Sequence, residues 1–292
     1  MNETDIKSLV AVVIIVIIAS CLALAGSQGG VTVLGRVPLF ALGVAVAFII
    51  QWTAFVPAYI KRTEKFFDLT GSLTYITVIT LSVVLSPEID TRSVLLMVLV
   101  MIWAIRLGTF LFRRIMKEGE DKRFKKFKQS ASRFLLTWTI QGLWVSFTLA
   151  AALAAITVER RVEFGIIGLI GLMIWIIGFG FESFADYQKS KFRSVPENKG
   201  KFITTGLWSI SRHPNYFGEI LLWIGIAIIA LPTLQGWRWL ALISPIFVAL
   251  LLTKVSGVPL LEKRADEKWG GQEEYEEYKR TTPVLIPNPF KR

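Results

Sequence analysis

The sequence predicts an all-α membrane protein, a polytopic bundle of about seven or eight transmembrane helices. Three observations support this fold class. Hydrophobic residues make up 53% of the 292 residues, and the mean hydropathy is +0.54. The apolar residues also fall into blocks of about 20, the length that crosses a bilayer as a helix. Alternating polar and apolar residues, which are typical of half-buried strands, are not evident.

Eight apolar blocks define the expected spans. The first, residues 9–25, follows a short polar start with Lys7 and leads directly into the next block. We therefore expect a retained helix there, and a cleaved signal peptide of similar length is the alternative. The other spans are expected at residues 37–60, 69–85, 94–112, 134–157, 164–185, 216–231 and 237–255.

The formal net charge of +11 is distributed so that it predicts the orientation of the chain. Lys and Arg number three in residues 61–68, nine in 113–133, six in 187–215 and seven in 256–292. The connections between these segments hold only one or two each. The positive-inside rule therefore explains the charge without a nucleic-acid ligand, and it places both termini in the cytosol.

Cys21 and His213 are the only residues of their types. A disulfide framework needs paired cysteines, and a structural metal centre needs several Cys or His ligands. We therefore expect neither a disulfide nor a metal site.

A polar stripe follows the sixth apolar block. Glu182, Asp186, Lys189 and Arg193 are spaced i, i+4, i+7 and i+11, so a helix would carry them on one edge that turns from acidic to basic. Such an edge can hold ribose hydroxyls at its acidic end and phosphates at its basic end. The alternative is that these side chains only satisfy one another at the membrane boundary.

The sequence SRHPNYFGE predicts a helix start. Pro214 suits the first helical position, and Ser211 or His213 can act as the cap. Free N–H groups at that start, next to Arg212 and His213, favour an anion. Asn215 and Glu219, which share a helical face one turn apart, follow at once in the next span.

The chain after residue 255 contains no further span. Residues 273–280 are expected to form a short helix with Tyr275 and Tyr278 on one side, followed by an extended proline-containing segment. This tail can fold back on the bundle as a lid, or it can be an unstructured segment associated with lipid.

Four stretches resemble a known family. FESFADYQKSKFR, TGLWSISRHPNYFGEILLW, VSGVPLLEKR and the closing Tyr-x-x-Tyr-x-x-Thr-x-x-x-x-Ile-Pro are similar to the steroid 5α-reductase-like membrane proteins, in particular their prokaryotic DUF1295 branch. The resemblance covers about residues 66–287. It divides the chain into N-terminal transmembrane helices, 1–65, and a reductase-like transmembrane domain with a cytosolic tail, 66–292.

The resemblance implies an NADPH-dependent reductase of a carbon–carbon double bond conjugated to a carbonyl, usually in a sterol or another lipid. The family's cofactor-binding Asp and Arg match Asp186 and Arg193, and its Asn-x-x-Gly-Glu block matches Asn215 and Glu219. Glu182 stands where steroid reductases have Asn. The matched motifs also contain the other residues assigned to the cofactor: Arg212, His213, Tyr216 and Glu262.

The substrate side matches the family less closely. Asp68 fits the position of a family acid, with a shorter side chain, and Trp103 stands before Arg106 where steroid enzymes have a Tyr. Because an indole N–H is only a hydrogen-bond donor, Trp103 cannot replace the acidic phenol, and Tyr75 is a substitute. Asp68 can donate a proton only in its protonated form, and otherwise it would orient a Tyr or a water. Arg106 is either functional or a structural cation that reaches the membrane surface.

A membrane methyltransferase of the isoprenylcysteine carboxyl type is the alternative enzyme. Its C-terminal part has a similar Arg-His-Pro-x-Tyr-x-Gly block and would bind S-adenosylmethionine. A transporter or scaffold without a cofactor is the third option. For the reductase we expect a monomer with a lipid-like substrate and no nucleic acid, in the plasma (inner) membrane if the source is prokaryotic.

Overall fold

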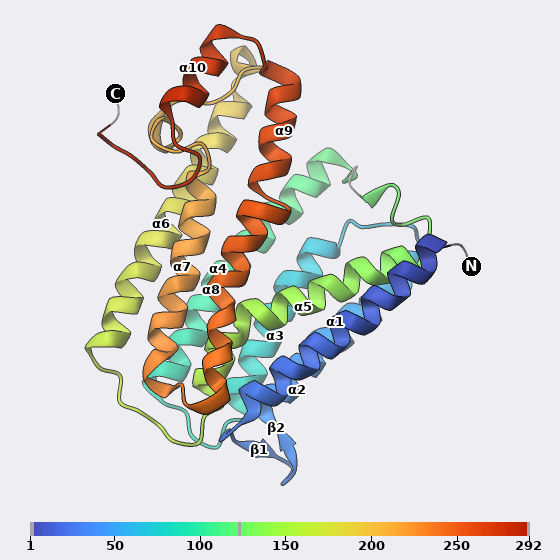
Figure 1. The fold of residues 1–292 in the computed structure, drawn as a ribbon, viewed down its shortest axis with the longest axis vertical. Coiled ribbons are helices and arrows are strands. Elements are labelled where there is room, and N and C mark those ends of the chain that lie inside the picture. Colours follow the sequence, from blue (N-terminus) through green and yellow to red (C-terminus); the bar gives the residue numbers. More distant parts are fainter. Residues whose placement is uncertain (1–2, 122–123, 291–292) are drawn as a thin grey trace. The chain divides into compact units, whose positions relative to one another are not determined.

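The computed structural model describes residues 3–121 and 124–290 and is almost entirely helical (Figure 1). The α-helices are α1 Glu3–Ser27, α2 Leu39–Ile60, α3 Phe67–Val84, α4 Thr91–Glu118, α5 Ala131–Ile156, α6 Ile166–Ser194, α7 Pro214–Ala230, α8 Ile243–Leu250, α9 Val258–Trp269 and α10 Glu273–Thr281. Two short antiparallel strands, β1 Thr32–Val33 and β2 Val37–Pro38, join α1 to α2. Short 3-10 turns lie at Pro196–Asn198, Gly206–Ser209, Leu231–Thr233 and Gly236–Leu242, and a π turn lies at Leu251–Val255.

The predicted all-α fold with eight spans is confirmed. Eight helical segments of the described chain are long and apolar enough to cross a membrane, and the chain is therefore an integral multi-pass membrane protein. The last of them, Gly236–Trp269, is a composite of 3-10, α and π turns that ends in α9. The sequence analysis ended this span at residue 255 and missed α9, whereas it predicted α10 correctly.

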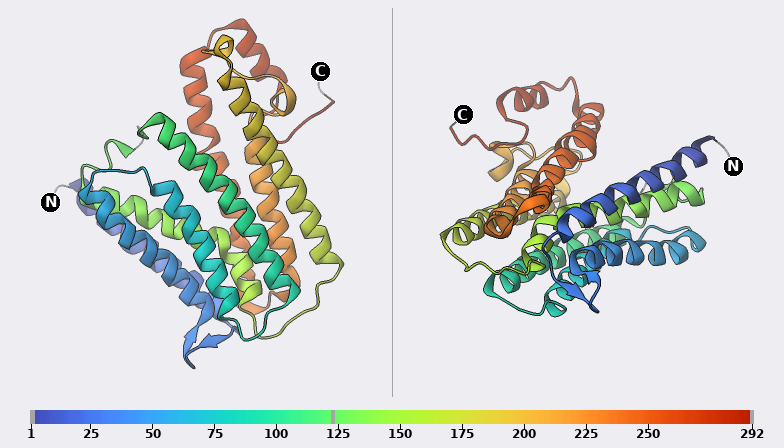
Figure 2. Two further views of the ribbon diagram at one scale, coloured as in Figure 1. Left: turned by 180° about the vertical axis from the view of Figure 1, so that it is seen from behind. Right: turned by 60° about the horizontal axis from the view of Figure 1, so that its bottom comes forward.

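The chain divides into two compact units. Unit 1 contains residues 1–165 and 229–244, and unit 2 contains residues 166–228 and 245–292. In unit 1, α1 and α2 both pack along α5 (Figure 2). Each residue of α5 from Leu149 to Ile156 is at most 1% exposed, and five of these eight residues are Ala. Small side chains let neighbouring helices approach closely, which explains why an apolar helix is buried on all sides here.

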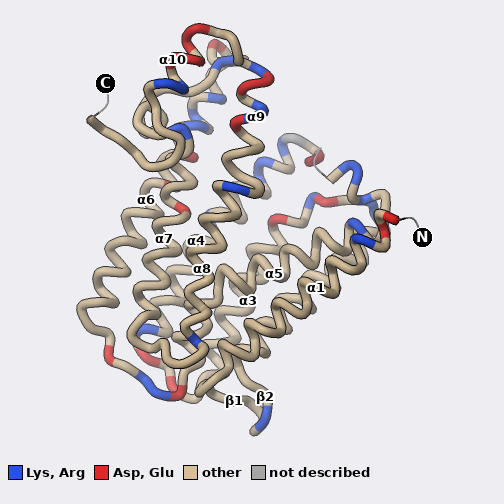
Figure 3. Tube along the Cα trace, in the orientation of Figure 1, with Lys and Arg blue, Asp and Glu red and all other residues tan. Residues whose placement is uncertain are grey.

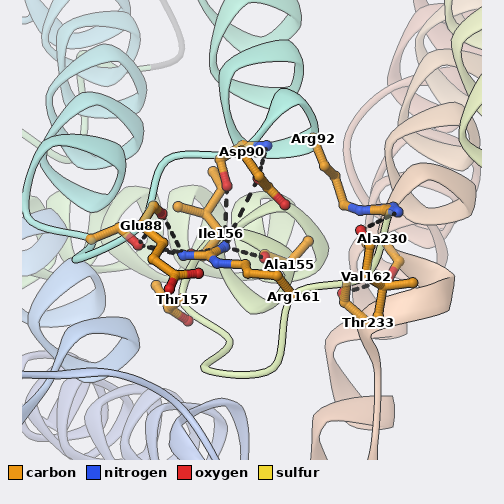
Figure 4. A network of polar contacts seen from close by, with 12 residues as sticks. Glu88, Asp90, Arg92, Ala155, Ile156, Thr157, Arg161, Val162, Ala230 and Thr233 are labelled. Atoms are coloured by element: carbon orange, nitrogen blue, oxygen red, sulfur yellow. Dashed lines mark hydrogen bonds and ion pairs between the residues drawn. The ribbon is translucent and has the colours of Figure 1, made fainter. Parts of the chain in front are cut away.

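Two arginines of unit 1 bind backbone carbonyls where its helices are connected (Figure 4). Arg92 is 1% exposed and donates to the carbonyls of Glu163 at 2.7 Å and Ile229 at 2.9 Å. Arg161 donates to the carbonyl of Ile156 at 3.0 Å. The last carbonyls of a helix have no partner within the helix, so these guanidinium groups satisfy acceptors that would otherwise be buried without hydrogen bonds.

A third buried arginine serves the same helix end. Arg238 is 1% exposed and donates to the carbonyls of Gln28 at 2.6 Å, Ala154 at 2.7 Å and Thr157 at 3.1 Å. It therefore joins the end of α1 to the end of α5. Arg92, Arg161 and Arg238 are among the one or two basic residues that the sequence analysis counted in each remaining connection, and their side chains bind backbone groups in the interior of the unit.

A buried carboxylate binds the basic segment between α4 and α5. Glu64 is 4% exposed, and its carboxylate accepts from Lys128 Nζ at 2.6 Å and from the backbone N–H of Asp121 at 2.8 Å. Two of the nine basic residues counted in this segment, Lys122 and Arg123, lie outside the described residues.

Candidate functional site

Helices α6 and α7 of unit 2 run side by side because glycines remove the side chains between them (Figures 1 and 2). A Cβ added at Gly178 would lie 2.5 Å from the backbone N of Leu222, and one at Gly218 would lie 2.4 Å from that of Glu182. Gly178 and Gly218 therefore serve close helix packing. Gly180, by contrast, has open space where its Cβ would be.

This close approach brings together two of the predicted polar residues. Asn215 Nδ2 donates to Asp186 Oδ1 at 3.1 Å, linking α7 to the polar stripe of α6. Asp186 and Glu182 are buried, at 8% and 2% exposure. The acidic part of the stripe therefore lies in the contact between the two helices.

The start of α7 has the geometry that the sequence predicts. Pro214 is the first helical residue, and the Oγ of Ser211 accepts from the N–H of His213 at 3.2 Å. The same Oγ donates to the carbonyl of Leu285 at 2.7 Å, and the N–H of Arg212 donates to that of Pro283 at 2.9 Å. The C-terminal tail thus packs back on this helix start, the first of its two predicted arrangements.

One carboxylate holds the two basic residues at this start. Glu262 of α9 contacts Arg212 Nη1 through Oε2 and His213 Nε2 through Oε1, both at 2.6 Å. The imidazole stacks on Tyr216, with ring centroids 5.6 Å apart and planes 8° apart. Burial lowers the pKa of His213 below its ordinary value, although its hydrogen bond to the Glu262 carboxylate acts in the opposite direction.

A cavity of about 520 Å³ opens beside this cluster within unit 2, a volume typical of ligand sites. Its wall contains seven Lys or Arg side chains and one carboxylate, and Figure 3 shows the basic positions gathered at the end of α6 and along α9. The lining side chains with charge are Lys189, Arg193, Lys199, Lys201, Arg212, Glu262, Arg264 and Lys268, together with His213. Such a wall attracts an anion strongly.

Aromatic rings form a second part of the cavity wall. Phe202 is packed by Trp269, Tyr275 and Tyr278, with ring centroids 5.3–5.7 Å apart. Tyr278 Oη donates to the carbonyl of Trp208 at 2.6 Å, and Trp269 Nε1 donates to that of Gly200 at 2.6 Å. These bonds tie α9 and α10 to the connection between α6 and α7, so the wall is assembled from distant stretches of sequence.

The structure separates the predicted cofactor residues into two groups. Arg193, Arg212, His213 and Glu262 line the cavity. The five others lie outside its wall, at or near the contact between α6 and α7: Glu182, Asp186, Asn215, Tyr216 and Glu219.

The residues predicted for the substrate side lie in unit 1. Tyr75 and Trp103 are both buried, and their rings meet edge to face at 5.0 Å and 85°. Asp68 Oδ2 lies 3.9 Å from Arg114 Nη2. The guanidinium of Arg106 lies 5.9 Å from the ring centroid of Phe110, on the same helix.

Apart from Glu262, Arg212 and His213, sequence reasoning missed the cavity residues of α9 and of the connection before α7. Leu261, Ala265 and Lys268 are spaced i, i+4 and i+7, and Pro259 stands near the helix start, so this spacing could have revealed α9. Lys199 and Lys201 give no comparable signal, because their place depends on how the connection folds. Within the described chain no group of three or more His, Cys, Asp or Glu side chains could hold a metal ion.

A family model described as "Protein of unknown function (DUF1295)" matches residues 54–282. The chain belongs to the DUF1295 family. This DUF1295 protein is 26% identical over 119 residues to 3-oxo-5-alpha-steroid 4-dehydrogenase 1 of Mus musculus, covering 41% of each chain. It is 27% identical over 121 residues to steroid 5-alpha-reductase DET2 of Arabidopsis thaliana, covering 41% of this chain and 40% of that relative.

The DUF1295 protein is also similar to a fungal enzyme. It is 32% identical over 112 residues to Delta(14)-sterol reductase ERG24A of Gibberella zeae, covering 33% of this chain and 22% of that relative. The chain thus spans less than half the length of each of these relatives. No solved structure matches it. The resemblance to steroid 5α-reductase-like proteins is confirmed at the level of the family.

Proposed function

We propose that this DUF1295 protein is an NADPH-dependent reductase of a conjugated carbon–carbon double bond in a lipid or steroid-like enone. The basic cavity of unit 2 carries this proposal. NADPH bears its negative charge on phosphate groups, and charge-assisted hydrogen bonds from Lys and Arg are the strongest that proteins make to phosphate. Seven cations against one carboxylate in a wall with six Phe, Trp or Tyr side chains suit a nucleotide.

Within this proposal the side chains have distinct tasks. Arg193 and Arg212 bind phosphate oxygens, and Glu262 orients Arg212 and His213 through its two contacts of 2.6 Å. The bond from Asn215 to Asp186 fixes the spacing of α6 and α7 beside the cavity. The assignment of Glu182, Asp186, Asn215, Tyr216 and Glu219 to the cofactor rests on the family resemblance.

The reduction needs a hydride and a proton. Bound NADPH would supply the hydride, and the charge that develops on the enone oxygen requires a donor. Asp68, whose Oδ2 lies 3.9 Å from Arg114 Nη2, is proposed to orient a donor. Tyr75, packed edge to face on Trp103, is our proposed donor. Arg106 is proposed to position the substrate.

The names of the relatives support the substrate class. Two are named for steroids and one for a sterol, and the eight apolar helices place the protein where such compounds dissolve. We further propose that both termini are cytosolic, that the protein is a monomer, and that it resides in the plasma membrane if the source is prokaryotic. The division of the chain into N-terminal helices, 1–65, and a reductase-like domain, 66–292, also stays a proposal.

The cavity charge argues against the methyltransferase. S-adenosylmethionine carries a positively charged sulfonium and no phosphate, so seven basic side chains would repel its reactive centre. Titrating detergent-purified protein with NADPH and with S-adenosylmethionine separates the two functions. Saturable binding of S-adenosylmethionine alone would establish the rival, and binding of neither would favour a transporter or scaffold.

Arg193→Ala tests the site itself. Losing a charge-assisted contact of about 1.5–3 kcal/mol should weaken NADPH binding roughly 10- to 150-fold. Lys191→Ala is the matched control, because Lys191 is exposed on the same helix and lies outside the cavity wall. Equal NADPH affinity in the two variants would remove the cofactor assignment. An anaerobic screen of NADPH oxidation against enone lipids and quinones then identifies the acceptor.

A further inference from the structure

His213 presents an incompletely bonded ring to the basic cavity. The residue is 4% exposed, its Nε2 lies 2.6 Å from Glu262 Oε1, and its Nδ1 is buried without a hydrogen-bond partner. A carboxylate only accepts hydrogen bonds, so Nε2 must carry a proton. In a neutral imidazole the other nitrogen is then an acceptor, so Nδ1 carries a bare lone pair in a ring that lines the cavity.

The groups around this ring set its charge. Glu262 faces it from α9, Lys189 acts on it from α6, Arg212 precedes it in the chain, and Tyr216 of α7 stacks on it. Burial lowers the pKa of His213, the two cations lower it further, and Glu262 raises it. At neutral pH the ligand-free ring is therefore mostly neutral.

We propose that binding of an anionic cofactor is coupled to the uptake of one proton by Nδ1 of His213, which makes this residue a proton-linked positioning group for a phosphate. This inference rests on the proposed function. Phosphodiester oxygens carry lone pairs and no proton at neutral pH, so they repel a bare Nδ1 and accept from a protonated one. The proton comes from solvent, an N–H bond forms, and no other bond changes. Arg212 Nε, also buried without a partner, is a second donor beside it.

A different ligand group at this position would act differently. A ribose hydroxyl or a carboxamide N–H could donate to the neutral Nδ1, and binding would then take up no proton. The seven cations of the wall favour the phosphate. The number of protons bound with the ligand therefore reports which kind of group contacts His213.

The test is calorimetric titration of the full-length, detergent-purified protein with NADPH between pH 7.0 and 8.5. Each pH is measured in two buffers of different ionisation enthalpy, which gives the number of protons taken up. We expect uptake to approach one proton, with the Kd rising about tenfold per pH unit. The 2′-phosphate, with a second pKa of about 6, stays doubly charged over this range.

Two variants assign the proton. His213→Gln should bring proton uptake and the pH slope of the Kd close to zero. Glu262→Gln should also lower the uptake, because its amide can donate to Nε2 and leave the neutral ring free to carry its proton on Nδ1. Lys191→Ala should keep the uptake of the original protein. NADPH binding without proton uptake, or uptake that persists in His213→Gln, would overturn the inference and leave the cofactor assignment standing. Absence of NADPH binding would overturn both.

Discussion

Gly218→Ala tests whether the contact between α6 and α7 determines the geometry of unit 2. The new Cβ would lie 2.4 Å from the backbone N of Glu182 and 2.5 Å from the carbonyl oxygen of Gly178. Both are backbone atoms, so neither can rotate away. The helices must separate by about 1.0 Å to restore the 3.4 Å of ordinary contact. An equal shift lengthens the 3.1 Å bond from Asn215 to Asp186 to about 4.1 Å, beyond hydrogen-bond range.

Two opposing energies decide the outcome for Gly218→Ala. Overpacking costs about 1–3 kcal/mol, while exchanging Gly for Ala within a helix gains up to about 1 kcal/mol. Gly180→Ala isolates the second effect, since Gly180 lies in α6 with open space around its Cβ position. We expect the two variants to differ by about 1–3 kcal/mol in the free energy of unfolding, with Gly218→Ala the less stable. The assay is reversible denaturation in detergent, and equal stability would refute the packing argument.

Two further predictions concern stability. Arg238→Leu leaves the carbonyl of Ala154 buried without this donor, whereas that of Thr157 keeps the N–H of Val31, so we expect a loss of about 1–3 kcal/mol, against little change for the exposed Arg36→Leu; a similar small effect of both in a thermal unfolding assay would contradict this. Burial lowers the pKa of His213 below the 6.5 of the unfolded chain, so its stabilising effect is present above pH 6.5 and is lost as the pH falls below it. Unfolding free energy measured from pH 7.5 to 5 should therefore fall less in His213→Gln, and parallel curves would show that another group is responsible.

The spans and the start of α7 could be predicted from the sequence because each follows from local rules. An apolar block of about 20 residues has no other favourable state in a bilayer, and Pro214 after a Ser at residue 211 specifies a helix start by itself. The close packing at Gly178 follows from an equally local rule, since small residues bring membrane helices together.

The cavity could not be predicted as a whole. Its wall combines side chains from α6, the following connection, α9 and α10, and their meeting depends on tertiary packing around Phe202. Helix α9 is polar and follows a π turn, so a search for apolar length passes over it. Arg92 and Arg238 were likewise misjudged, because a count of loop charges does not show which guanidinium groups bind buried carbonyls.

The bonds of Arg238 also set an order of events during synthesis. Its partner Ala154 is made 84 residues earlier, an interval of about 4–17 s at translation rates of roughly 5–20 residues per second. Arg161, only five residues after Ile156, is available almost at once. Through that interval the carbonyl of Ala154 depends on water or a temporary partner, whereas that of Thr157 can already accept from the N–H of Val31. Unit 1 therefore becomes complete only after all of α6 and α7 have been made, and a nascent chain that stops before residue 238 lacks the bonds of Arg238 between the ends of α1 and α5.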